Sequence, residues 1–307
     1  MTGSGSSKSR SAEENSAFLG GFASILFILL YLTGCSLTGC SAGHQENIRI
    51  HTTDKTHLYK NGSREVAGMV ARSVSESGLP PASCLSEESK DPRALLITGG
   101  HRFDTTAFFR LFNSINDVHV DTLSHPHARS LMASDHILSY DLLVFYDFLP
   151  HQDPGDSLLY QNLSHHGIPL LFLHHSICNI QSWNGFPELV GGRYVEAAYA
   201  VDSTKRSGYQ HDLELKIEIV NRNHPVTRNM EDFTILDEGY YNLQTEEGIE
   251  PLLVTDHPRC HPVVGWVNRY GRSTSVYLML GHDRKAYENP SFRQLVENSI
   301  HWLSRNH

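Results

Sequence analysis

The fold is decided by the stretch Arg93–Asp104, which reads Ala94-Leu95-Leu96-Ile97-Thr98, then Gly99-Gly100, then His101-Arg102-Phe103-Asp104. A short apolar run that ends in glycines predicts a buried strand. The next segment, 105–115, has apolar residues at helical spacing, so the strand should turn into a helix. Ligands bind outside the carboxyl ends of strands in open parallel sheets. We therefore expect His101 and Asp104 to lie where a ligand binds.

The chain after this unit alternates apolar strands with helical segments. Short strands are expected at 118–120, 140–146 and 168–173, and a helix at 156–166 that ends at Gly167. Strands joined by helices pair in parallel through right-handed crossovers. The sequence therefore predicts an α/β fold with a doubly wound, mostly parallel sheet.

The pattern changes past Gly191. Strict alternation over 213–219 indicates a half-buried strand, and 262–267 with 274–280 predict a C-terminal antiparallel hairpin. A closing helix is expected over 290–304, with one apolar face. No internal repeat or second core is visible, so we assign one domain to residues 92–307.

Composition narrows the function classes. The 307 residues carry a net charge of -9 with no basic block in the folded part, which argues against nucleic acid as a partner. Histidine is unusual, because 17 of the 20 lie from His101 onward. Neutral imidazole serves as metal ligand or general base, although any single one can be an ordinary surface residue.

The N-terminus predicts a targeting segment. Lys8 and Arg10 precede the apolar run 18–32, which suits a signal peptide better than a membrane span. The run ends in Leu32-Thr33-Gly34-Cys35, and Leu37-Thr38-Gly39-Cys40 repeats it. Both resemble the lipobox of bacterial lipoproteins, in which the cysteine is lipidated; an uncleaved anchor is the alternative.

This reading assigns residues 1–40 to a lipoprotein-type signal segment and 41–91 to a flexible polar linker. The domain should then lie in a bacterial cell envelope, lipid-anchored at Cys35 or Cys40 and facing the periplasm or the exterior. Past these two, only Cys84, Cys178 and Cys260 remain, and an odd number cannot form a complete disulfide framework.

Candidate site residues lie in four predicted loops. Two follow the strands at 94–98 and 168–173, one holds His224 with Asp237, Glu238 and Tyr240, and the last follows the strand at 274–280. Imidazoles and carboxylates at strand ends can build a divalent metal site or an acid/base pair. No tight ligand signature such as His-Glu-x-x-His is present. The candidates are His101, Asp104, His174, His175, Trp183, His224, Asp237, Glu238, Tyr240, Trp266, His282 and Asp283.

Each candidate also has a structural alternative. Asp104 can cap the helix that follows it, and His175 can cap another. His282-Asp283 can form a turn, Asp237-Glu238 can be a solvated pair, and Trp183 can pack in the interior. Chance can place one polar candidate at the end of a predicted strand, but it is less expected to place four there. We therefore keep the functional interpretation.

Several motifs, in this order along the chain, resemble the ThuA-like (trehalose utilisation) family. They are Gly99-Gly100-His101, Leu173-His174-His175, His224-Pro225-Val226-Thr227, Asp237-Glu238-x-Tyr240, and Leu280-Gly281-His282-Asp283 followed by Asn289-Pro290-x-Phe292. The likeness runs from about Arg93 to Trp302. It implies a flavodoxin-type fold like that of class I glutamine amidotransferases, and a role in carbohydrate catabolism with 3-keto sugars and disaccharides as substrates.

The amidotransferase relationship can be tested within the sequence. Those enzymes need a cysteine thiolate on a sharp strand-to-helix elbow. In this chain the elbow after Leu173 carries His174 and His175, and Cys178 follows later, where it suits a small buried apolar residue. Glutamine hydrolysis by that route is not expected.

The sequence leaves three functions open. In the first, an enzyme acts on a sugar derivative outside the cytoplasmic membrane: His174, His175 or His282 serves as base or metal ligand, and Asp237 or Glu238 completes the site. Substrate binding then falls to the aromatic residues and the remaining polar candidates, which are Trp183, Tyr240, Trp266, His101, Asp104, His224 and Asp283. A divalent metal is possible, with His175, His282 and Glu238 as candidate ligands.

The second function is a surface-anchored sugar-binding protein, and the third a scaffold in a sugar-processing complex; a homo-oligomer is possible in each case.

Overall fold

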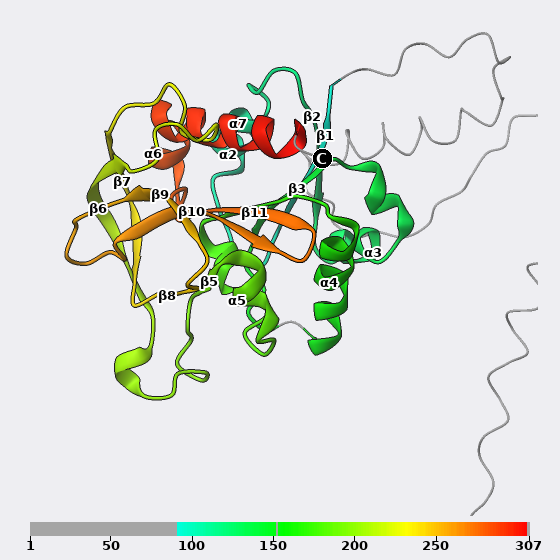
Figure 1. The fold of residues 1–307 in the computed structure, drawn as a ribbon, viewed down its shortest axis with the longest axis horizontal. Coiled ribbons are helices and arrows are strands. Elements are labelled where there is room, and N and C mark those ends of the chain that lie inside the picture. The colour runs from blue at the N-terminus through cyan, green and yellow to red at the C-terminus, as the bar shows by residue number, and fades with distance from the viewer. Residues whose placement is uncertain (1–90, 152, 306–307) are drawn as a thin grey trace, which may run out of the picture. The chain divides into compact units, whose positions relative to one another are not determined.

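The computed structural model describes residues 91–151 and 153–305 (Figure 1). The predicted signal segment, Cys35, Cys40 and nearly all of the predicted linker lie outside these residues. Within the described part of the chain, no helix is both long and apolar enough to cross a membrane.

A nine-stranded sheet forms the centre of the fold, in the order β2-β1-β3-β4-β11-β10-β9-β6-β7. In that order the bounds are His119–Ser124, Arg93–Gly99, Leu142–Asp147, Leu170–Leu173, Ser273–Leu278, Val263–Tyr270, Glu250–Val254, Gly208–Ile219 and Phe233–Tyr241. The strands from β2 to β11 pair in parallel, and the pairings from β11 to β7 are antiparallel. The predicted α/β fold with a parallel core is therefore confirmed, and its antiparallel part is larger than expected.

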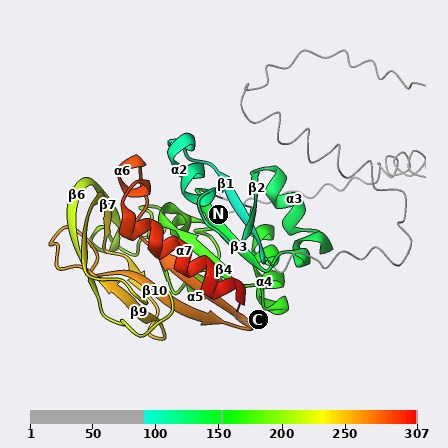
Figure 2. The same cartoon turned by 90° about the horizontal axis from the view of Figure 1, so that it is seen from above.

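The central parallel strands are buried because helices cover both faces of the sheet, whereas the edge strand β2 is exposed or half-buried. Every residue of β3 and β4 is buried, as near-continuous apolar runs require. Figure 2 shows α7 lying across the strands, and α4 and α5 pack on β11. The helices are α2 (Thr105–Phe112), α3 (His127–Met132), α4 (Ser157–His166), α5 (Gly185–Val190), α6 (Arg284–Tyr287) and α7 (Pro290–Arg305).

Shorter elements complete the fold. Strands β5 (Gly192–Arg193) and β8 (Gln244–Thr245) form a separate two-stranded sheet. The 3₁₀ turns are η1 (Asp135–Ser139), η2 (Pro154–Asp156), η3 (His174–Cys178) and η4 (Ser203–Lys205).

The turn after β1 needs glycine. Gly100 has φ +77°, and a Cβ there would lie 1.9 Å from the carbonyl oxygen of Phe148. Only a residue without a side chain allows this approach. The tight turn brings His101 to the carboxyl edge of the sheet, next to the loop that follows β3.

The β6–β7 hairpin carries half of the candidate site. β6 pairs with β9 only through Glu218 and Ile219, so the rest of the hairpin is a ribbon that leaves the main sheet. The ribbon contacts the loop after β11. There the Asp237 carboxylate accepts hydrogen bonds from the amides of Gly281 and His282. Chain segments far apart in sequence therefore meet at the carboxyl edge of the parallel strands.

One prediction about this region is wrong. Asp237, Glu238 and Tyr240 were expected in a loop, but all three lie on β7. The acidic pair interrupts the apolar alternation by which a half-buried strand is recognised, and both carboxylates are buried. Hydrogen bonds from other segments make that burial possible.

Candidate functional site

The site is built around a strained turn at the end of β4. His174 follows Leu173 with φ 50°, in the left-handed region that side chains rarely adopt. The turn leads directly into η3, which is the strand-to-helix geometry of a nucleophile elbow. The Tyr277 hydroxyl donates to the His174 carbonyl oxygen at 3.1 Å. Backbone strain of this kind persists where the surroundings hold it, and it is concentrated at functional sites.

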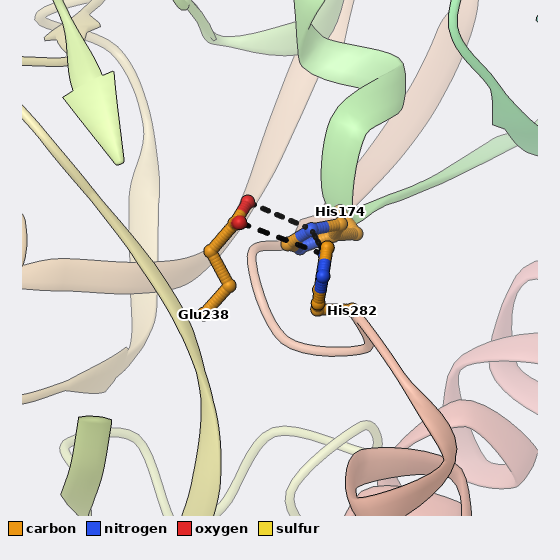
Figure 3. Close-up of side chains that lie close together, drawn as sticks. All are labelled: His174, Glu238 and His282. Atoms are coloured by element: carbon orange, nitrogen blue, oxygen red, sulfur yellow. Dashed lines mark hydrogen bonds and ion pairs between the residues drawn. The ribbon is translucent and has the colours of Figure 1, made fainter. Parts of the chain in front are cut away.

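The buried His174 ring has more polar neighbours than one nitrogen can satisfy. Its Nδ1 lies 2.6 Å from the Met279 carbonyl oxygen, which can only accept, so Nδ1 carries a proton. Around Nε2 lie His282 Nδ1 at 3.1 Å and Glu238 Oε1 at 3.3 Å (Figure 3). The Tyr240 hydroxyl lies 3.0 Å from the same nitrogen. One nitrogen offers one proton or one lone pair, so these groups compete for it.

Glu238 is the acidic member of this cluster. Its Oε2 lies 2.7 Å from His211 Nδ1 and 3.7 Å from His282 Nδ1. Burial raises the pKa of Glu238, but the hydrogen bond and charge of His174 outweigh it and hold the pKa below its usual value. The carboxylate is therefore ionised near neutral pH.

The pKa values of the His174 and His282 imidazoles are shifted in opposite directions by their surroundings. Burial lowers the pKa of His174, but the hydrogen bond that His174 donates to Glu238 and the negative charge of Glu238 raise it overall. Burial, with the charge of His174, lowers the pKa of His282 to about 4. The site thus places a neutral imidazole next to a more basic one, both within reach of one carboxylate.

Asp237 holds the site in position instead of facing the cavity. It accepts hydrogen bonds from the amides of Glu238, Gly281 and His282, at 2.7–3.0 Å. Burial raises its pKa to about 6, against the charge of His174 and these amides. The prediction that Asp237 is catalytic is therefore replaced by a positioning role for the His282 loop.

A cavity of about 810 Å³ opens over this cluster. It is lined on one side by the loops after β1, β3, β4 and β11, and on the other by the 194–211 segment and β7. Six of the predicted residues line it together: His101, His174, His175, Glu238, Tyr240 and His282.

His175 lies beneath the exposed ring of His101, with ring centroids 4.7 Å apart. Neither of its ring nitrogens has a hydrogen-bond partner among the described residues. Burial and the charges of His174 and His101 hold the pKa of His175 well below its usual value. Of the predicted metal ligands, His282 and Glu238 belong to the cluster, and His174 takes the place expected for His175.

Other polar candidates lie outside the cavity. Asp104 caps α2 by accepting from the Ala107 amide, and Asp283 caps α6 by accepting from the Lys285 amide. His224 packs its ring against Trp302 at 4.4 Å. The structure thus gives all three predicted substrate-binding residues structural contacts instead.

The two predicted tryptophans are also structural. Trp266 is completely buried and donates its indole N–H to the Val190 carbonyl oxygen at 2.8 Å. Trp183 packs on Tyr160 and Phe186 and does not line the cavity. A buried indole cannot stack on a sugar, so the predicted role of Trp266 is wrong. Tyr240 is also buried, with its ring against His174, so the accessible aromatic rings at the cavity are those of Phe148, Tyr194 and Tyr209.

His211 is a site residue that the sequence interpretation missed. The expected strand began at residue 213, but β6 begins at Gly208 and has an irregularity between Gln210 and Leu213, where Asp212 has φ 54°. The irregular register turns His211 toward Glu238, and Lys285 pairs with Asp212 at 2.6 Å. No local period marks such a bulge, so only the three-dimensional structure reveals His211.

Cys178 lines the cavity but is not placed as a nucleophile. It lies at the end of η3 and is 3% exposed, and burial raises the pKa of its thiol far above the ordinary value. A protonated thiol is a poor nucleophile. Histidine occupies the elbow in its place.

Comparison with known proteins gives a consistent family. A family model described as ThuA, trehalose utilisation, matches residues 93–303. A ThuA-like protein from Parabacteroides merdae is 15% identical, with a TM-score of 0.58 over 70% of this chain and 91% of that one. A ThuA-like protein from Bacteroides uniformis is 17% identical, with a TM-score of 0.54 over 74% of this chain and 95% of that one. No curated protein matches the sequence.

Proposed function

Because the chain belongs to the ThuA (trehalose utilisation) family, we propose that it is an enzyme acting on a sugar, either a 3-keto sugar or a disaccharide. The chemistry is acid/base or metal-assisted. The observation that carries the proposal is the convergence of His174, Glu238 and His282 on one point of the cavity.

The cluster suits proton abstraction next to a carbonyl group. A 3-keto sugar has acidified protons on the carbons beside its ketone. Glu238 is ionised and His282 is neutral, so either can accept such a proton. In the acid/base route, which uses the cluster without a metal ion, His174, whose pKa is raised, can donate from Nε2 to the oxygen on which negative charge develops. Elimination, isomerisation and glycoside cleavage all begin with this step.

The cavity suits a sugar in size and lining. Its volume of about 810 Å³ lies within the range of about 300–1,000 Å³ that holds drug-sized ligands, and a disaccharide is of that size. Phe148, Tyr194 and Tyr209 line it with rings that are not buried, and aromatic faces pack well against sugar rings.

The strained elbow supports an enzyme over a protein that only binds sugar. A left-handed histidine and a buried, oversubscribed nitrogen both reduce stability, and holding hydroxyl groups requires neither. Catalysis gives a reason to keep such an arrangement. The position of Cys178 argues against glutamine hydrolysis for the same protein.

The test is turnover of 3-keto glucosides and 3-keto disaccharides by the purified chain. Proton exchange beside the ketone, followed by NMR in D₂O, reports the common first step whatever the product. Glu238→Gln should slow exchange by about 10²–10⁴-fold, the usual contribution of a general base. Glu250→Gln, an equal change on an exposed carboxylate of β9, should not.

Saturable sugar binding without exchange or turnover would instead establish the sugar-binding protein. Absence of both binding and turnover over the whole panel would reject a sugar as the ligand.

We also propose that the enzyme acts in the cell envelope, tethered by a lipid on Cys35 or Cys40. Support for this comes from the two lipobox-like motifs alone. Labelling with a fatty-acid analogue in Cys35→Ala, Cys40→Ala and the double variant tests it. Label that persists in the double variant would contradict the assignment.

A further inference from the structure

We propose that His174, Glu238 and His282 bind one divalent transition-metal ion of the zinc class, with a coordination position left open to the cavity. The use of this ion on a sugar rests on the proposed function, but its binding does not. The inference is drawn from distances, protons and outer hydrogen bonds in the cluster.

The spacing of the three side chains fits a tetrahedral ion. Bonds of about 2.0–2.1 Å from zinc to nitrogen and oxygen put neighbouring ligand atoms about 3.4 Å apart. The observed separations are 3.1 Å between His174 Nε2 and His282 Nδ1, 3.3 Å from His174 Nε2 to Glu238 Oε1, and 3.7 Å from His282 Nδ1 to Glu238 Oε2. The two Glu238 distances involve different carboxylate oxygens, and one ligand atom from each residue lies within 4.8 Å of the others. Rotation of the Glu238 carboxylate would therefore bring a single oxygen toward both nitrogens.

The positions of the protons in the cluster also support a bound metal ion. His174 Nδ1 carries its proton toward Met279, so Nε2 of the neutral ring offers a lone pair toward the cluster. Figure 3 shows His282 and Glu238 converging on that nitrogen. Two imidazole nitrogens 3.1 Å apart beside a carboxylate can share only one proton in a hydrogen bond. A cation between them satisfies both lone pairs and the carboxylate together.

Two of the three proposed ligands are oriented by a second group that contacts the side chain. Metal-bound histidines usually donate their other N–H to a carbonyl or carboxylate, and bound carboxylates are usually hydrogen-bonded in turn. His174 donates to Met279, and His211 contacts the Glu238 oxygen Oε2 at 2.7 Å. Asp237 fixes the backbone amide of His282. The contacts at His174 and Glu238 are those expected around a metal ion, and for His282 the backbone of its loop is fixed.

The ligand set indicates the class of ion and its role. Two imidazoles with one carboxylate favour zinc and similar transition metals, whereas magnesium and calcium prefer oxygen ligands. Three protein ligands leave a fourth position for water or substrate, as in catalytic zinc sites. That position faces the cavity, where a ketone oxygen with a neighbouring hydroxyl group can chelate the ion.

The experiment measures zinc binding to the full chain, purified without a histidine tag and stripped with a chelator. Competition against a chromophoric chelator should give about one zinc ion per chain. His282→Ala and Glu238→Gln should weaken binding by at least about 100-fold, and His211→Ala by about 10–100-fold. The matched control is His151→Ala, an exposed imidazole at the rim of the same cavity, which should bind zinc normally.

Cobalt(II) absorption provides a second measurement, because four-coordinate and six-coordinate ions have different spectra. The inference is overturned if the unchanged protein binds no zinc, or if His282→Ala, folded by circular dichroism, binds it as tightly. Sugar turnover by zinc-free protein would leave the proposed function intact and remove only the metal. Zinc binding that requires the three residues, without turnover of any sugar, would do the reverse.

Discussion

Two histidine–carboxylate clusters lie at the carboxyl edge of the parallel strands, and they differ in kind. In the first, His174, Glu238 and His282 meet in the cavity. In the second, Asp147 at the end of β3 is completely buried, with Oδ2 3.1 Å from His125 Nε2 and Oδ1 accepting from Asn179 Nδ2 at 2.8 Å. The amide oxygen of Asn179 in turn accepts from the Leu149 amide at 2.6 Å.

The difference lies in how many partners each group has. Each of these polar contacts in the second cluster joins one donor to one acceptor, and none of its members lines the cavity. In the first cluster one nitrogen faces three polar atoms, and all three residues line the cavity. Residue type and burial therefore do not identify a site; unmatched polar capacity beside open space does.

The largest effect on stability is expected for Asp147→Ala in the second cluster. Removing the carboxylate leaves the His125 and Asn179 donors unsatisfied, which should lower the free energy of unfolding by about 1–3 kcal/mol for each donor. Chemical denaturation measures this. Activity per folded molecule should change little, because Asp147 does not face the cavity. A large loss of activity with unchanged stability would show that the second cluster is also functional.

Asp237→Asn should produce the opposite result at the first cluster. The variant keeps one acceptor but turns an amide toward the Gly281 N–H, so the loop bearing His282 should shift. We expect activity to fall by about 10–100-fold, as for misplaced catalytic groups. Asp232→Asn, the same change near the other end of the hairpin, is the control. Equal kinetics in the two variants would contradict a positioning role for Asp237.

Replacing His125 should separate hydrogen bonding from packing in the second cluster. His125→Leu leaves a buried carboxylate oxygen without its donor, which should cost about 1–3 kcal/mol of stability. His125→Gln can donate again and should recover most of that loss. Thermal denaturation of both variants is the measurement, and equal destabilisation would mean that the imidazole is needed for its shape.

The smallest effect is expected at a third carboxylate, which lies near solvent. Asp121 contacts Arg93 at 2.8 Å and His119 at 3.1 Å. Burial raises the pKa of Asp121, but the Arg93 and Tyr140 hydrogen bonds outweigh it and lower the pKa overall. A lowered pKa means that the ionised form adds stability above the unfolded pKa, near 3.9, and that this is lost as the pH falls through the folded value.

Asp121→Asn should therefore cost less than about 1 kcal/mol at pH 7, since half-exposed pairs are screened by solvent. The gap between wild type and variant should close below about pH 4. A gap that stays constant down to pH 2 would exclude the charge as its source.

Much of the fold could be predicted from local patterns. The strand at Ala94–Thr98 and the apolar face of α7 were recognised because burial follows a period of a few residues. His101, His174 and His282 were recognised for the same reason, since each follows an apolar run. Glu238 was chosen as a residue but assigned to a loop, and His211 was not chosen at all.

The sequence by itself determined the strands of the parallel core, the closing helix and which histidines follow those strands, because those features depend on neighbours along the chain. Only the tertiary structure decided which of them meet. Glu238 reaches His174 only because the β6–β7 ribbon folds back over β4 and β11. That Trp266 cannot contact a sugar is likewise visible only from its burial in the folded chain. Such contacts depend on the packing of distant segments and on the exclusion of water from the polar groups between them. A local sequence pattern carries no information about either of these.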